Sequence, residues 1–249
     1  MDNQVIFKIY DRLPRQGPGN EECTAKAFRM IPNIPKNAVI LDIGCGKGEH
    51  TLKLAGLCGE CTIVALDIHQ PYLDELEKKA NDKDVSGRVK AVCGSMDALP
   101  FDEESFEIIW AESSVFIMGF GKGLNYWKKF LKPRGYMVVT DAVWFTDNPS
   151  DEAALHWNEE YPDMKNEMEN RRIIESAGYS VISSFRLPEQ VWWDSYYDHL
   201  EKCLEDLKEE FRGNIEAEQI IRMSEKEMNI FRKYPDEFGI TFFIIQKIA

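Results

Sequence analysis

Two glycine-rich segments near the N-terminus could bring a ligand close to the backbone. The first is RQGPG, residues 15–19, and the second is LDIGCGKG, residues 41–48. A glycine-rich turn between a strand and a helix commonly receives a nucleotide. The second segment is not a dinucleotide loop, because Glu49 stands where the last glycine is needed, and no Gly-Lys-Ser/Thr follows. With an acid at the helix start and no lysine to hold a phosphate, this segment predicts an adenosine-like ligand without phosphates.

The segment LDIGCGKG resembles the acidic-x-Gly-x-Gly-x-Gly loop of class I S-adenosylmethionine-dependent methyltransferases. The general outline is similar to the ubiquinone/menaquinone-biosynthesis group of that family. In this family a carboxylate at the end of the second strand binds both ribose hydroxyls, and Asp67 stands at that position. A carboxylate suits a vicinal diol because its two oxygens accept two hydrogen bonds at once. The resemblance implies S-adenosylmethionine (SAM) as the cofactor and S-adenosylhomocysteine (SAH) as the product.

Three further segments extend the resemblance over about residues 36–145. GSMDALPF (94–101) resembles the loop after the third strand, which implies that Asp97 accepts from the adenine amino group. FEIIWAES (106–113) resembles the fourth strand, whose end lies beneath the sulfonium, and FLKPRGYMVV (130–139) resembles the turn before the fifth. Taken over the glycine loop, the end of the second strand and these segments, the resemblance implies the following cofactor-binding residues: Asp42, Gly44, Cys45, Gly46, Gly48, Asp67, Ile68, Ser95, Met96, Asp97, Ala111 and Glu112.

The segment RQGPG allows two interpretations. Gly17-Pro18-Gly19 could form a plain turn between two helices, since these residue types dominate turns. A turn alone does not account for Arg15 and Gln16, however. Arg15 and the exposed backbone at Gly17 could instead meet the cofactor carboxylate from the side opposite residues 44–48. We favour this shared site over a plain turn.

Methyl transfer from a sulfonium is an in-line displacement, so the protein must align the reactants, exclude water and, for some acceptors, remove a proton. His156 and Glu112 are the candidate catalytic residues. His156 lies in an aromatic segment after the fifth strand, a region that commonly faces the acceptor in this fold. The alternative, an exposed histidine without a role, is the more favoured interpretation of this residue. Aromatic residues in this segment and in residues 189–237 suit a pocket that excludes water and could hold a cationic acceptor.

Strand and helix patterns alternate along the chain and predict a parallel sheet. Apolar strand patterns cover residues 38–43, 61–67, 88–95, 106–113, 135–145, 180–188 and 239–248, and helical patterns cover 5–13, 21–31, 48–57, 71–82, 123–132 and 170–179. Together with the resemblance, they predict an α/β fold, a three-layer αβα sandwich. Its mostly parallel seven-stranded sheet would have an antiparallel last strand, with N-terminal helices and helical insertions added.

The expected organisation is a helical cap over residues 1–35, packed on the cofactor cleft, and a methyltransferase domain over residues 36–249. Within this domain, a lid or acceptor insertion is expected at about 144–165 and a helical excursion at about 189–237. The pair CGEC (58–61) has redox or zinc spacing, but no second pair completes a metal set, so no metal is expected. The six cysteines are expected to be reduced.

The formal net charge of −13 limits the partners of this chain. An acidic surface repels nucleic-acid phosphates, so a small-molecule acceptor is favoured. No signal peptide and no apolar run long enough to span a bilayer is recognised, which predicts a cytoplasmic protein without membrane insertion. The oligomeric state is left open. Two alternatives remain: a SAM-binding protein without transferase activity, and a nucleic-acid methyltransferase. The second is less favoured because the fourth strand ends in AESS rather than in a motif that holds a flipped base.

Overall fold

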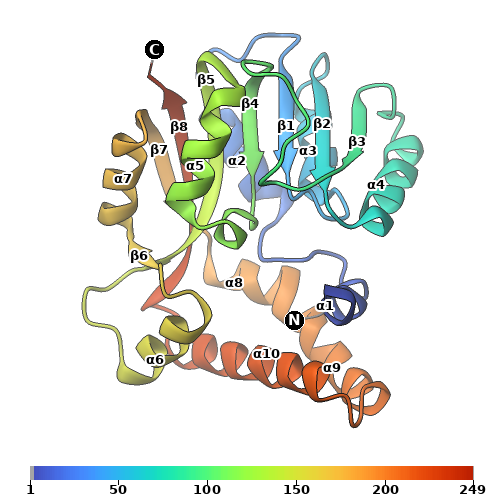
Figure 1. Ribbon diagram of the computed structural model, residues 1–249, viewed down its shortest axis with the longest axis vertical. Coiled ribbons are helices and arrows are strands. Elements are labelled where there is room, and N and C mark those ends of the chain that lie inside the picture. The colour runs from blue at the N-terminus through green and yellow to red at the C-terminus, as the bar shows by residue number, and fades with distance from the viewer. Residues whose placement is uncertain (1–2, 249) are drawn as a thin grey trace.

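The computed structural model describes residues 3–248 of the chain. A twisted sheet stands between two layers of helices, and a further group of helices lies across one end of the strands (Figure 1). The strands are β1 (Val39–Ile43), β2 (Thr62–Asp67), β3 (Val89–Cys93), β4 (Phe106–Ala111), β5 (Leu131–Trp144), β6 (Lys165–Asn166), β7 (Tyr179–Arg186) and β8 (Phe238–Lys247).

The order of the strands is β3-β2-β1-β4-β5-β8-β7, with β6 paired to β5. Strand β8 is antiparallel to β5 and β7, whereas the other pairs are parallel. The predicted fold class and its antiparallel last strand are therefore confirmed. The sheet has eight strands instead of seven, because the two-residue strand β6 is too short to leave a sequence pattern. Strands β2 and β3 are added on one side of β1, whereas β4 and β5 are added on the other side. The strand order therefore reverses between β1 and β4, and open α/β sheets bind ligands beside such a switch point.

Helices cover both faces of the sheet. On one face lie α2 (Glu21–Arg29), α3 (Glu49–Leu57) and α4 (Gln70–Asp82), and on the other lie α5 (Phe120–Trp127) and α7 (Glu167–Ser176). Short 3₁₀ turns, η1 (Val115–Ile117) and η2 (Lys128–Phe130), flank α5. Successive residues of a strand point to opposite faces, so Ile40 packs in one core and Leu41 in the other, and both are fully buried. This arrangement explains why the central strands read as continuous apolar runs.

The remaining helices form a layer across the carboxyl ends of the parallel strands, seen at the bottom of Figure 1. We call it the lower layer. It contains α1 (Asn3–Tyr10), α6 (Asp151–Glu160), α8 (Glu189–Trp192), the π-helical turn η3 (Trp193–Tyr197), α9 (Asp198–Glu210) and α10 (Ile215–Lys233). Helix α10 is amphipathic and buries Ile220, Ile221 and Phe231, with Phe231 stacked 4.6 Å from Trp192. The N-terminal helix α1 contacts α10, so segments that are far apart in the sequence lie side by side in the lower layer (Figure 1).

One sequence-based expectation about the cysteines changes. Cys58 and Cys61 form a disulfide, because the turn after α3 brings their Cα atoms to 5.4 Å, which is within the range that a disulfide bridges. The expectation that all six cysteines are reduced is therefore wrong for this pair, and Cys23, Cys45, Cys93 and Cys203 are free. No helix within residues 3–248 has both the length and the apolar character needed to cross a membrane.

Candidate active site

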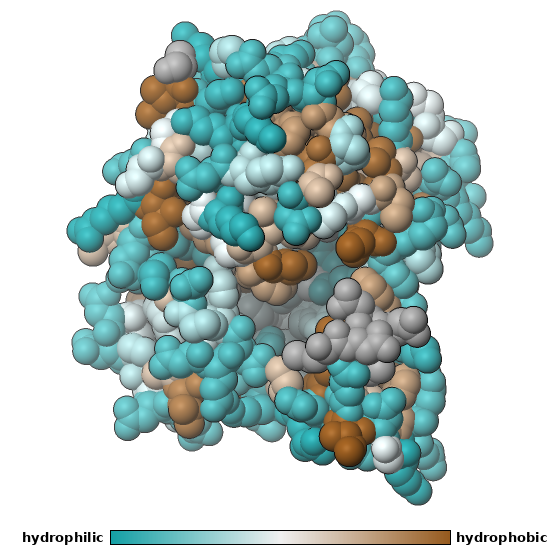
Figure 2. Space-filling model, viewed as in Figure 1, coloured by the Kyte–Doolittle hydropathy of each residue, from teal (hydrophilic) through white to brown (hydrophobic). Residues whose placement is uncertain are grey.

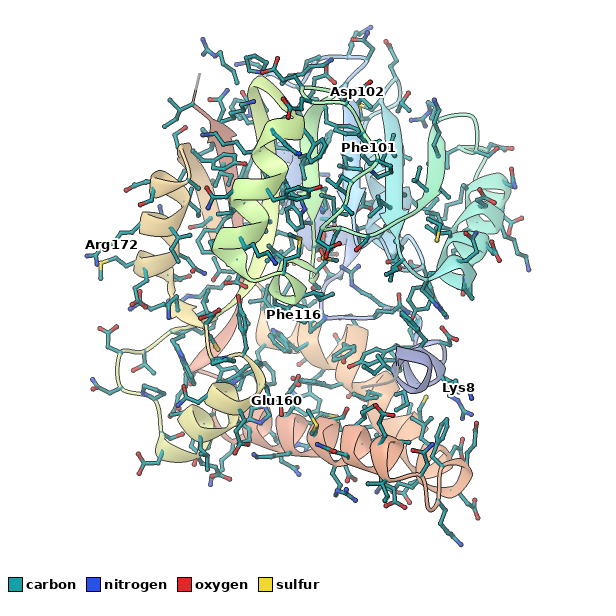
Figure 3. All side chains as sticks on the ribbon, viewed as in Figure 1. Lys8, Phe101, Asp102, Phe116, Glu160 and Arg172 are labelled. Atoms are coloured by element: carbon teal, nitrogen blue, oxygen red, sulfur yellow. A yellow bond between two sulfur atoms is a disulfide. The ribbon has the colours of Figure 1, made fainter. Side chains whose placement is uncertain are left out.

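A large cavity lies between the carboxyl ends of the strands and the lower layer. Its volume is about 620 Å³, in the range of small-molecule sites. Figure 2 shows the hollow between the upper and lower parts of the molecule, and Figure 3 places Phe116 above it and Glu160 below it. A second cavity of about 40 Å³ adjoins it. The two cavities share Gln16, Gly17, Gly44, Gly46 and Ser113 in their walls, so they are neighbouring parts of one site.

The loop after β1 forms one wall of this site. Its glycines Gly44, Gly46 and Gly48 have φ angles of 72°, 52° and 82°, which residues with a side chain rarely adopt. Gly48 is the N-cap of α3 and Gly44 donates its N–H to the carbonyl of Leu66 at 2.8 Å. The turn therefore exposes backbone to the cavity where β1 passes into α3.

Asp67 lies at the end of β2 and lines the large cavity. Its carboxylate accepts from the N–H of Gly46 at 2.9 Å and from the N–H of His69 at 2.9 Å. Burial raises the pKa of Asp67, and these two hydrogen bonds oppose that shift. The two N–H groups hold the carboxylate in place, and its remaining lone pairs are available to hydroxyl donors.

The segment RQGPG forms the facing wall. The Gln16 side-chain oxygen accepts from the N–H of Lys47 at 3.2 Å, which joins the two glycine-rich segments directly. A Cβ atom at Gly46 would lie only 2.6 Å from the same Gln16 oxygen. The structure thus places both segments around the same cavities, and Arg15 and Gly17 line the small one. Their contact with a cofactor stays a prediction.

Arg15 and Glu112 form an ion pair at the end of the small cavity. The Arg15 guanidinium donates to Glu112 Oε1 at 2.5 Å, and the Glu112 side chain has no exposed surface. Glu112 Oε2 also accepts from Thr24 Oγ1 at 3.0 Å and from Trp110 Nε1 at 3.0 Å. A cation and an anion held side by side are complementary to a zwitterion, since one can bind a carboxylate and the other an ammonium.

The other predicted cofactor residues divide into two groups. Ile68, Ser95 and Met96 line the large cavity, and Cys45 and Gly48 line the small one. Asp42, Ala111 and Asp97 line neither cavity. Asp42 is buried and accepts from Thr51 Oγ1, with His50 Nε2 at 3.0 Å, so it anchors the start of α3. Asp97 is exposed and accepts a hydrogen bond from Ser95 Oγ, so it contacts a residue of the cavity wall without lining the cavity itself.

His156 does not lie where the prediction of a catalytic base required it. Its side chain is buried within the lower layer and lines neither cavity. Its ring packs against Trp157 with centroids 5.2 Å apart, and neither ring nitrogen has a hydrogen-bond partner within the described residues. Burial lowers the pKa of His156. The helical periodicity of α6 explains the difference, because Trp157, Glu160 and Tyr161 occupy the side of the segment that faces the cavity.

Asp141 is a cavity residue that the sequence analysis did not single out. It stands on β5, is 3% exposed and lines the large cavity. Its carboxylate accepts from Tyr161 Oη at 3.1 Å and from Asn170 Nδ2 at 2.9 Å. Burial raises the pKa of Asp141 to about 7, and the two hydrogen bonds limit the shift. A carboxyl that titrates near neutral pH is suited to accept a proton. The available signal was an acid inside the apolar strand GYMVVTDAVWF.

Part of the chain matches a known family of protein domains. Residues 40–135 match the family described as "Methyltransferase domain". This stretch contains the loop after β1, Asp67 and strand β4. The recognition of a methyltransferase domain from the glycine loop is therefore confirmed for residues 40–135.

The chain is also similar to individual proteins. The chain is 30% identical over 119 residues to the ubiquinone/menaquinone biosynthesis C-methyltransferase UbiE of Rickettsia massiliae, and the match covers 46% of this chain and 47% of that protein. The match thus spans about half the length of this curated relative. YjhP of E. coli superimposes with a TM-score of 0.81 at 20% identity, covering 99% of each chain. A SAM-dependent methyltransferase of Geobacter sulfurreducens, solved with SAH, gives 0.80 at 15% identity, covering 97% of each. At these identities the structural likeness establishes the fold.

Proposed function

We propose that this chain is a SAM-dependent methyltransferase that moves a methyl group to a small-molecule acceptor. The observation that carries the proposal is the junction of the two cavities. The small cavity ends at Arg15 and Glu112, the wall between the cavities is the glycine loop, and the large cavity begins at Asp67. A ligand with a zwitterion at one end and a diol-bearing nucleoside at the other would match these three features in order.

The donors and acceptors present fit SAM residue by residue. Arg15 would bind the carboxylate of the methionine portion, and Glu112 would bind its ammonium. Asp67 would accept from the ribose hydroxyls, while Ile68 and Met96 would supply apolar surface for the adenine. The binding role of each of these residues stays a prediction, as do the roles of Ser95 and Asp97. When bound, SAM would supply an electrophilic methyl group on a sulfonium.

The side chains of the large cavity would complete the chemistry. The lower layer covers the carboxyl ends of the strands and would keep water from the acceptor. Thr140 Oγ1 accepts from the N–H of Ser113 at 2.7 Å, which holds the ends of β4 and β5 together beside Asp141. Asp141, oriented by Tyr161 and Asn170, would accept a proton from the acceptor. The segments 144–165 and 189–237 would act as the acceptor walls that the sequence analysis expected.

Two measurements test the proposal. Calorimetry with SAH should show one site per chain, and incubation with methyl-labelled SAM and a metabolite extract should label a small molecule. Failure to bind either SAM or SAH would refute the proposal. Binding without transfer to any acceptor would favour the alternative of a SAM-binding protein without activity, but an ionisable group as buried as Asp141 in the cavity favours the enzyme. A cytoplasmic location, expected from the sequence, stays a prediction.

A further inference from the structure

The charged side chains that line the large cavity share one sign. Among the described residues of its wall, the acidic ones are Asp67, Asp141, Glu160 and Glu227. None of the described wall residues is a lysine, arginine or histidine. Asp67 belongs to the cofactor end. The other three come from β5, α6 and α10, so three separate elements bring carboxyl groups to the part of the cavity beyond the glycine loop.

These three carboxyl groups have no cationic partner within 4.0 Å among the described residues. Glu227 accepts from Tyr197 Oη at 2.6 Å, and Asp141 accepts only from neutral donors. The cation near Glu160 is Lys226, whose ammonium pairs with the neighbouring Glu159 at 2.9 Å. Carboxyl groups gathered without a counterion are costly, and a cation entering the cavity would relieve that cost.

Aromatic rings complete the same walls. Tyr10, Tyr72, Phe7, Trp157, Tyr161, Trp192, Tyr196 and Phe116 line the large cavity. Tyr196 donates to Tyr10 at 3.2 Å, which fixes two of these rings in the lower layer. At the mouth, Phe116 is 50% exposed and Ile68 is 58% exposed, so the entrance is apolar. Aromatic faces attract cations, and acids added behind them strengthen this preference.

We infer that the acceptor is an amine bound as its ammonium, carried on an apolar body. This inference rests on the proposed function for its chemistry. The carboxylate of Asp141 takes one proton from the ammonium, and the freed nitrogen lone pair forms a bond to the methyl carbon. The carbon–sulfur bond of the sulfonium donor breaks, and its electron pair stays on sulfur. The product is a methylated ammonium, and the proton on Asp141 passes to water.

The test compares two probes of the same shape without any cofactor. Choline carries a quaternary ammonium, and 3,3-dimethylbutan-1-ol has a carbon atom in place of that nitrogen. Calorimetry at pH 8, where Asp141 is ionised, should give binding of choline at least about tenfold tighter than binding of the alcohol. The variant Glu227→Gln should lose most of this preference. The matched control Glu225→Gln removes one charge from the same helix at a surface pair with Lys208 and should keep it.

The outcomes separate this inference from the proposed function. Equal binding of both probes, absence of choline binding at the concentrations that saturate a millimolar site, or equal effects of Glu227→Gln and Glu225→Gln would each overturn the cationic acceptor. If SAH binds in a parallel titration while choline shows no preference, the methyltransferase proposal stands and only the acceptor class fails. If choline is preferred but SAH does not bind, the cavity is a cation site and the methyltransferase proposal fails.

Discussion

Replacing Asp141 by Asn tests whether the buried carboxyl serves activity at the expense of stability. The change keeps the shape of the side chain and removes its charge. Tyr161 Oη can still donate to the new amide oxygen. Asn170 donates to Asp141 through Nδ2, and its Oδ1 has no partner among the described residues. A flip of the Asn170 amide would therefore offer an acceptor to the new amide N–H, so Asp141→Asn should be accommodated without a cavity or a clash.

The magnitude follows from the difference between the folded and ordinary pKa values of Asp141. Burial raises the pKa from 3.8 to about 7, so between these pH values the native state holds a proton that the unfolded state has released. The wild type should therefore lose stability as the pH rises from 4 to 7, by at most about 4 kcal/mol. The variant lacks this titration. Its advantage over the wild type should grow over the same pH window and remain above it.

Thermal unfolding between pH 4 and pH 8 checks this expectation, with Asp206→Asn on the exposed side of α9 as the control. The Tm of Asp141→Asn minus the Tm of the wild type should be several degrees larger above pH 7 than at pH 4. Its methyl-transfer rate should fall by about 100-fold or more if Asp141 is the proton acceptor. Its affinity for SAH should stay unchanged. A stability difference that does not depend on pH would refute the assigned pKa, and unchanged transfer would refute the role as a base.

The remaining predictions concern the cofactor end and His156. Asp67→Ala should weaken SAH binding by about 1.5–3 kcal/mol, which is the scale of hydrogen bonds to a charged acceptor. The control Asp74→Ala, on the exposed side of α4, should leave SAH binding unchanged. Equal affinities of the two variants in calorimetry would show that Asp67 does not bind the ribose. Arg15→Ala should weaken SAH binding by about 10-fold or more, because SAH has a carboxylate that Arg15 would bind. The same variant should bind 5′-methylthioadenosine as well as the wild type does, because this ligand lacks the amino-acid portion. An equal loss for both ligands would mean that Arg15 only maintains the structure around Glu112. His156→Phe should keep the transfer rate and raise the free energy of unfolding, because two buried ring nitrogens without partners are removed; a large loss of rate would restore His156 as a catalytic candidate.

One mutation that the sequence would suggest is poorly suited as a test. A Gly46→Val change would place a side chain where the glycine loop exposes its backbone to the cavity. Gly46 has φ of 52°, and a Cβ there would lie 2.6 Å from the Gln16 oxygen. The substitution would strain the backbone and push the two walls of the site apart. A loss of SAH binding in this variant would therefore not distinguish ligand contact from local unfolding.

The cofactor half of the site could be predicted because its parts follow one another closely along the chain. The loop after β1 and the acid at the end of β2 each adjoin an apolar strand, and neighbouring parallel strands end at the same edge of a sheet. The acceptor half lacked such a signal. Asp141 meets Tyr161, 20 residues away, and Asn170, 29 residues away, only because the chain after α6 and helix α7 return to the end of β5.

The sequence by itself determined the alternation of strands and helices, the turn conformations that require glycine at Gly44–Gly48, and the position of Asp67. These features depend on local periodicity and on backbone angles, which each short segment carries on its own. Only the tertiary structure decided that RQGPG faces the glycine loop, that His156 points away from the cavity, and that Asp141, Glu160 and Glu227 meet there. Side chains from separate elements come together through the packing of helices on the sheet, and no spacing along the chain specifies that packing.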